Sequence, residues 1–210
     1  MSDVLHFPSK VGIIKDSLSL RDLQPIIDEI KTIIQNTSDA ESVTWELAGQ
    51  IDHEFALNTS VPFLENLILP YLRKYNDEFK HMDSIAVLSE NRELTLEKAW
   101  VNFQKKHEYN PMHNHSGVFS FVIWLHIPYT QDSEIQTGPG KHSNSPGSNG
   151  QFSFYYTTGL GAVTVFKISC DREKEGMLMV FPADLNHSVN PFYSSDDYRI
   201  TVSGNFFFKV

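Results

Sequence analysis

The stretch Tyr109-Asn-Pro-Met-His113-Asn-His115-Ser-Gly, followed by the apolar run from Val118 to Pro128, is the most informative part of the chain. On an extended backbone alternate side chains share a face, so His113 and His115 would point the same way. Imidazole is the commonest protein ligand for a transition metal. The pair therefore indicates a metal site at the start of a buried strand, with an incidental or structural pair as the alternative.

A third histidine and an arginine lie far downstream on strand-like segments. His187 is followed, twelve positions later, by Arg199-Ile-Thr201. Three protein ligands on one face of a metal leave positions open for a chelating cosubstrate and dioxygen. A buried guanidinium is a fixed fork for a carboxylate, and Thr201 shares its strand face. The alternative for Arg199 is a surface ion pair with Asp196 or Asp197.

Composition excludes several classes of protein. The chain has 210 residues, of which 40% are hydrophobic and 20% charged, as in an ordinary globular protein. A net charge of -9 disfavours a nucleic-acid partner, since phosphate binding needs clustered Lys and Arg. Cys170 is the single cysteine, which excludes a disulfide framework and a Cys-based zinc site. Neither a signal peptide nor an apolar run of roughly 20 residues is present, so we expect a cytoplasmic protein without a membrane partner.

Helical periodicity is confined to the first part of the chain. Apolar residues repeat at helical spacing from Leu20 to Gln35 and from Pro62 to Phe79. The first helix is expected to be capped by Asp22, and the second by Thr59 or Ser60.

From residue 83 onward the pattern changes to that of strands. Strands are predicted over residues 84–89, 96–105, 117–128, 152–157, 161–169, 176–182, 186–190 and 197–208, after two short pieces over 4–7 and 10–15. Strands at this spacing, with no helix between them, indicate an antiparallel sandwich or barrel. Thr130 to Gln151 is rich in Gly, Ser, Pro and Asn, and is expected to be a disordered loop or a lid.

Three other histidines are expected to play no part in a metal site. His53 is expected to be structural or exposed, and His142 to be solvated. His126, inside the long apolar run, is expected to be a core histidine with a hydrogen-bond partner.

Residues 100–210 resemble the 2-oxoglutarate/iron(II)-dependent oxygenase superfamily. The resemblance rests on Trp100-Val-Asn102, on His113-Asn-His115 with the apolar strand after it, on His187, and on Arg199-Ile-Thr201. Phage-encoded members look similar, including a segment like Trp45-Glu-Leu-Ala-Gly49.

The resemblance implies a mainly β fold with flanking α-helices. It implies a double-stranded β-helix, that is, a jelly-roll or cupin-like core, over residues 83–210, with a helical flank over 1–82 in a single domain. It implies a dioxygenase that hydroxylates a small molecule or a peptide side chain with dioxygen. The implied iron(II) ligands are His113, His115 and His187. The residues implied to bind 2-oxoglutarate are Arg199, Thr201 and Asn102, and Arg199 joins the three histidines in the catalytic set.

One position departs from the superfamily pattern. His115 stands where these enzymes usually have Asp or Glu, and a neutral imidazole leaves the iron one unit more positive. Asp184 or another carboxylate is an alternative ligand. Two other functions are also open: a different cupin-type metalloenzyme, in which Arg199 anchors the substrate, and a non-catalytic jelly-roll binding protein.

Overall fold

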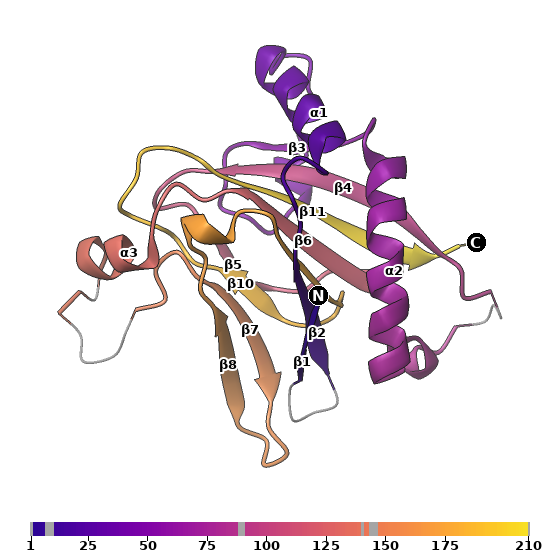
Figure 1. The fold of residues 1–210 in the computed structure, drawn as a ribbon. Helices are drawn as coiled ribbons and strands as arrows, with labels where there is room; N and C mark the ends of the chain where they lie inside the picture. Colours follow the sequence, from indigo (N-terminus) through magenta and orange to yellow (C-terminus); the bar gives the residue numbers. More distant parts are fainter. Residues whose placement is uncertain (1, 7–10, 88–90, 140, 143–146, 210) are drawn as a thin grey trace.

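Two antiparallel sheets packed face to face form the body of the protein (Figure 1). The computed structural model describes residues 2–6, 11–87, 91–139, 141–142 and 147–209. The large sheet has the order β1 (Asp3–His6), β2 (Gly12–Ser17), β9 (Met177–Pro182), β6 (Phe119–His126), β11 (Arg199–Phe208), β4 (Leu94–Gln104) and β3 (Glu54–Ala56). The small sheet has the order β5 (Asn110–His113), β10 (His187–Val189), β7 (Phe152–Thr157) and β8 (Val163–Ile168). The predicted mainly β architecture with flanking helices is confirmed.

The large sheet is buried on both faces, which explains the nearly continuous apolar run of β6. Phe119, Phe121 and Ile123 face the helix layer, whereas Val122 and Trp124 face the small sheet. Because successive side chains of a strand alternate between faces, one strand contributes to two separate hydrophobic clusters.

Helices α1 (Gln24–Gln35) and α2 (Val61–Phe79) cover the outer face of the large sheet (Figure 1). The first helix begins later than predicted, and its N-cap is Leu23 rather than Asp22. Pro25 occupies the first turn, where its missing N–H costs nothing, so the helix begins directly before it. Within the described segments, no helix combines the length and the apolar character that a bilayer-spanning segment needs.

The N-terminus of α2 is capped by a side chain from α1. Ser60 is the N-cap residue as predicted, but its hydroxyl makes no capping bond to the helix backbone. It donates instead to Glu29, whose carboxylate also accepts from the backbone N–H groups of Asn58, Thr59 and Ser60. A carboxylate is favourable at a helix N-terminus, so this contact ties the two helices together.

One predicted strand is absent from the described residues, and one segment predicted to be a disordered loop or a lid is more regular than expected. No strand forms over 84–87, because Lys80, the C-cap residue of α2, is in the left-handed conformation and a 3-10 turn, His81–Ser84, follows. Residues 88 and 89 of that predicted strand lie outside the described residues. The segment 130–151 is not wholly irregular: Thr130 caps a short helix, α3 (Gln131–Thr137), and buried Glu134 holds the backbone N–H groups of Tyr193 and Ser194. Residues 140 and 143–146 are outside the described part.

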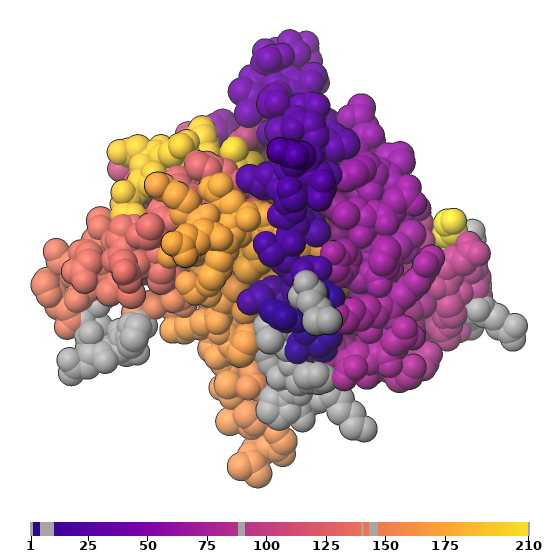
Figure 2. Space-filling view, viewed as in Figure 1, coloured from indigo at the N-terminus to yellow at the C-terminus, as the bar shows by residue number. Residues whose placement is uncertain are grey.

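The N-terminal region contributes strands as well as helices. β1 and β2 extend the large sheet beyond β9, and β3 forms its opposite edge beside β4. In Figure 2 this first segment (indigo) runs over the surface between the α2 region (magenta) and the region that includes β7 and β8 (orange). Strands from both sides of residue 82 thus share one sheet, and the single-domain organisation stays a prediction.

Gly117, between the two histidines and β6, has a backbone conformation that few other residues adopt. Its φ is +109°, and an added Cβ would lie 2.7 Å from the carbonyl oxygen of Phe206. We expect Gly117→Ala to lower the free energy of unfolding by about 1–3 kcal/mol. Gly159→Ala is the matched control, because Gly159 has no other atom within 4 Å of the added carbon. Urea unfolding measures both, and equal stabilities would contradict the strain at Gly117.

Candidate active site

Strand pairing brings the distant histidines together. In the antiparallel pair of β5 and β10, His113 lies directly opposite His187. Directly opposed residues project to the same face of a sheet. His115 follows β5, and its backbone N–H donates to the carbonyl of Ala183 at 2.8 Å. Three imidazoles from two chain segments therefore meet at one end of the small sheet.

The three rings are close enough to hold one ion. The ring centroids of His113 and His187 are 4.3 Å apart, those of His113 and His115 are 4.9 Å apart, and those of His115 and His187 are 5.0 Å apart. One ring nitrogen of each lies within 4.8 Å of the others. Metal–imidazole bonds of about 2.1 Å hold ligand nitrogens up to about 4.2 Å apart, so small ring rotations complete the geometry.

Hydrogen bonds orient two of the rings. Nδ1 of His113 lies 2.7 Å from the carbonyl of Pro111, and Nδ1 of His187 lies 2.8 Å from that of Leu185. A carbonyl only accepts, so each Nδ1 carries the hydrogen and each Nε2 keeps a free lone pair. This is the outer support that metal-binding histidines usually have.

Burial keeps all three rings in the neutral form that a metal ligand needs. Desolvation lowers the pKa of His113. Desolvation, and then the repulsion that His113 would exert if both rings were protonated, lower the pKa of His115 to about 4. The pKa of His187 is well below its ordinary value, because of its burial and then its two histidine neighbours. Phe152 stacks on His187 with centroids 5.3 Å apart, and Trp100 packs edge-on against His115.

Among the described residues, the cluster of possible metal ligands contains no carboxylate. Asp184 is exposed and is not part of the cluster. The structure therefore offers no support for an acidic third ligand, and the group matches the three-imidazole set predicted from the sequence. The role of these residues as ligands stays a prediction.

A cavity of about 390 Å³ opens beside the three imidazoles. Asn102 and Thr201 line it, and they are directly opposed neighbours on β4 and β11. Nδ2 of Asn102 donates to Oγ1 of Thr201 at 3.0 Å. Trp100 and Trp124 supply apolar wall, and residues from the segment 46–51 close the cavity on another side.

Arg199 lies behind the cavity wall and is only 1% exposed. Its two terminal nitrogens donate to the hydroxyl of Tyr129, the side chain of Gln104, and the carbonyls of Gly150 and Asn190. Its Nε has no partner among the described residues. The surface ion pair considered from the sequence is absent from the described part: Asp196 pairs with Lys106, and Asp197 lies beside His126.

Gln104 was missed by the sequence reasoning. It lines the cavity and accepts a hydrogen bond from Arg199, so it connects the guanidinium to the cavity. Its position two residues after Asn102 on the same strand was the available signal, because both side chains face the same side.

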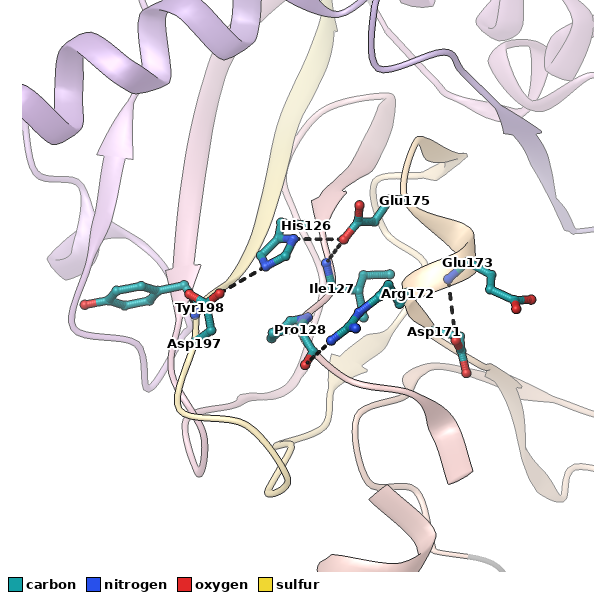
Figure 3. Close-up of polar contacts among 9 residues, drawn as sticks. All are labelled: His126, Ile127, Pro128, Asp171, Arg172, Glu173, Glu175, Asp197 and Tyr198. Atoms are coloured by element: carbon teal, nitrogen blue, oxygen red, sulfur yellow. Dashed lines mark hydrogen bonds and ion pairs between the residues drawn. The ribbon is translucent and has the colours of Figure 1, made fainter. Parts of the chain in front are cut away.

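His53, His126 and His142 are not part of the cluster, as expected. Figure 3 shows His126 between two carboxylates, with Nδ1 2.8 Å from Glu175 and Nε2 3.3 Å from Asp197. It has hydrogen-bond partners as predicted, but it is partly exposed rather than a core residue. His53 stacks against Phe55, and His142 is exposed.

Glu54 is a second residue that sequence reasoning missed. It is fully buried on β3, and neither carboxyl oxygen has a hydrogen-bond partner among the described residues. Burial, and then the charge of Glu108, raise the pKa of this carboxyl to about 8.

Comparison with known proteins identifies the relatives of this architecture. The family described as "Putative 2OG-Fe(II) oxygenase" matches residues 98–205, just over half of the chain. A search of curated proteins gave no match.

Solved structures share the fold at low sequence identity. A prolyl-4-hydroxylase from Pseudomonas putida is 11% identical, with a TM-score of 0.56 over 96% of this chain and 95% of that chain. The non-heme alpha ketoglutarate dependent epimerase SnoN from nogalamycin biosynthesis is 13% identical, with a TM-score of 0.55 over 95% and 78%. OsALKBH1 is 10% identical, with a TM-score of 0.51 over 97% and 99%. These likenesses confirm the predicted double-stranded β-helix.

Removal of one imidazole should abolish tight metal binding. We expect His187→Ala and His113→Ala to weaken binding of iron(II) by at least about 100-fold, since even an outer partner of a ligand is worth roughly 10- to 100-fold. Anaerobic calorimetry measures this affinity. His142→Ala, at an exposed position, is the control and should bind as the wild type does. Wild-type affinity in both cluster variants would rule out this centre.

The buried carboxyl of Glu54 should make stability depend on pH. Its pKa is about 8 when folded and 4.5 as the ordinary value, so the unfolded chain releases the proton first as the pH rises. Wild-type stability should therefore fall relative to Glu54→Gln between pH 5 and 8, by about 1.4 kcal/mol per pH unit at most, and level off above. Chemical unfolding across this range measures the difference. Glu173→Gln, at an exposed site, should show no such trend.

Proposed function

Because the chain belongs to the 2OG-Fe(II) oxygenase family, which uses iron(II) and 2-oxoglutarate, we propose that it hydroxylates a small molecule or a peptide side chain. His113, His115 and His187 are the proposed iron ligands. When bound, iron(II) and 2-oxoglutarate supply the activation of dioxygen, and the cosubstrate is oxidised to succinate and carbon dioxide. The observation that carries the proposal is the convergence of three neutral imidazoles beside a cavity.

The proposed site for the distal carboxylate of 2-oxoglutarate is the end of the cavity near Arg199. Its guanidinium is buried, and the described residues give it only neutral oxygens as acceptors. A buried cation without an opposite charge is costly, so an anion at this position would stabilise the protein. The unpartnered Nε of Arg199 and the hydroxyl of Thr201 are the donors that the chain offers.

The imidazole at position 115 affects how the cosubstrate is held. With three neutral ligands, the two positive charges of iron(II) are balanced by no protein carboxylate in the described cluster. The dianionic cosubstrate therefore meets two positive centres, the iron at one end and Arg199 at the other. These two positive centres together favour binding of a dicarboxylate over a neutral ketone or a monocarboxylate.

The dimensions of the cavity support a small substrate group. A volume of about 390 Å³ is near the lower end of the roughly 300–1,000 Å³ found for small-molecule pockets. The cosubstrate occupies part of this volume, which leaves room for a small molecule or a single side chain. Glu46 and Lys98, paired at 2.7 Å, line the cavity and present charge to whatever enters.

The proposed function is tested by titrating iron(II)-loaded protein with 2-oxoglutarate without oxygen. We expect a visible charge-transfer band in the wild type, since chelation joins both ligands on one metal. Affinity should fall roughly 10- to 100-fold in Arg199→Gln, which removes hydrogen bonds from a charged donor, and roughly 3- to 10-fold in Thr201→Val. Thr164→Val, on β8 and outside the cavity lining, is the matched control.

Aerobic turnover completes this test. The wild type should convert 2-oxoglutarate to succinate, and His187→Ala should not. A protein that binds metal without affinity for 2-oxoglutarate would instead be a different cupin-type metalloenzyme. A protein that binds neither would be a non-catalytic jelly-roll protein.

A further inference from the structure

Four buried oxygen atoms close to the cavity have no hydrogen-bond donor among the described residues. They are the two carboxyl oxygens of Glu54 and the amide oxygens of Asn102 and Asn110. Asn102 and Asn110 line the cavity, whereas Glu54 lies behind them. A buried acceptor without a donor loses its bonds to water and gains nothing in return, so such a group of oxygens requires an explanation.

The four oxygens belong to one cluster. Glu54 lies directly opposite Asn102 in the pairing of β3 with β4, so their side chains project to the same face. Asn110 reaches the same place from β5, as Gly49 shows: a Cβ added there would lie 2.7 Å from Oδ1 of Asn110 and 3.0 Å from Oε1 of Glu54. Because Gly49 packs against the carboxyl, the carboxyl faces protein rather than the open cavity.

The surroundings of Glu54 favour the carboxylic acid over the carboxylate. Glu108, in the connection between β4 and β5, adds a negative charge nearby, and burial acts in the same direction to raise the pKa of Glu54. Segment 46–51 brings Glu46, which is paired with Lys98 of β4. The other titratable groups on β4, β5 and β11 are Glu97, His113 and Arg199, and Arg199 is bonded to Gln104.

A row of side chains connects Glu54 to the cosubstrate end of the cavity. Thr201 on β11, Asn102 on β4 and Glu54 on β3 occupy successive paired positions across the large sheet. Nδ2 of Asn102 donates to Oγ1 of Thr201 at 3.0 Å. Because Oγ1 accepts this bond, the hydroxyl hydrogen of Thr201 is directed elsewhere and is available to an anion in the cavity.

We propose that Glu54 is a positioning residue for the cosubstrate. As a neutral acid it donates its hydrogen to Oδ1 of Asn102, and this bond fixes the donor and the acceptor of each hydrogen bond along the row. Nδ2 of Asn102 then faces Thr201, and the Thr201 hydroxyl donates to the distal carboxylate. Ionised Glu54 would favour the opposite amide orientation, with Nδ2 toward the carboxylate and Oδ1 toward Thr201. The Thr201 hydroxyl would then donate its hydrogen to Oδ1 of Asn102 and not to the cosubstrate. This inference rests on the proposed function.

The experiment is anaerobic calorimetry of 2-oxoglutarate binding to the iron(II)-loaded protein from pH 6.5 to 9.5. Wild-type affinity should fall roughly 3- to 10-fold as Glu54 ionises, the value of one hydrogen bond. Glu54→Gln keeps a donor at this position and cannot ionise. It should match the wild type at pH 6.5 and lose less affinity at high pH, because titration of all other groups is common to both proteins.

A double-mutant cycle locates the effect on the proposed row. Glu54→Leu should weaken binding by a similar factor at pH 6.5, but should add nothing in a Thr201→Val background, where the final donor is already missing. If Glu54→Leu does not fold, the pH profiles of the wild type and Glu54→Gln still decide the matter.

The outcomes separate this inference from the proposed function. Wild-type binding that weakens at high pH, with a flatter profile in Glu54→Gln, supports the role of Glu54. Parallel profiles in the two proteins, whether flat or falling, overturn that role and leave the oxygenase proposal intact. No binding of 2-oxoglutarate by the wild type at any pH overturns the proposed function and, with it, this inference.

Discussion

The pairing of β5 with β10 is the constraint on which the candidate site depends. It places His113 opposite His187, and the nearby bond from His115 to Ala183 adds the third imidazole. Side chains alternate between faces, so a slip of one residue in either strand would turn one imidazole away from the others. Backbone hydrogen bonds thus set the geometry of the cluster, and the rings of Trp100 and Phe152 pack against His115 and His187.

The sequence predicted those parts of the protein that depend on local periodicity. Alternation along 197–208 correctly placed Arg199 and Thr201 on one face, and the apolar run after Gly117 correctly indicated a strand covered on both sides. Short helices were harder to predict. The capping signal of α3 is a Thr and a Ser within a segment rich in turn residues. Its buried Glu134 accepts hydrogen bonds from residues that are distant in the chain.

Periodicity could not reveal the environment of Arg199 or Glu54. Two of the acceptors around Arg199 are backbone carbonyls, at Gly150 and Asn190, and every residue type has such a group. The buried carboxyl of Glu54 on β3 is surrounded by Asn102 of β4, Asn110 of β5 and the backbone of Gly49. This environment depends on tertiary packing. Residue type indicated that these groups could do chemistry, and only the packing showed which partners they have and which they lack.

The two faces of the large sheet are constrained in different ways: one packs against helices and the other lines the cavity. Its helix-covered face needs only apolar side chains of suitable volume, and cores of that kind tolerate extensive replacement. The opposite face bears the hydrogen-bonding row and adjoins the imidazoles. The helix-covered face can therefore accept many replacements, whereas the opposite face depends on particular donors and acceptors at Thr201, Asn102 and Glu54. This tolerance of apolar cores explains how one architecture can be shared with solved structures at only 10–13% identity.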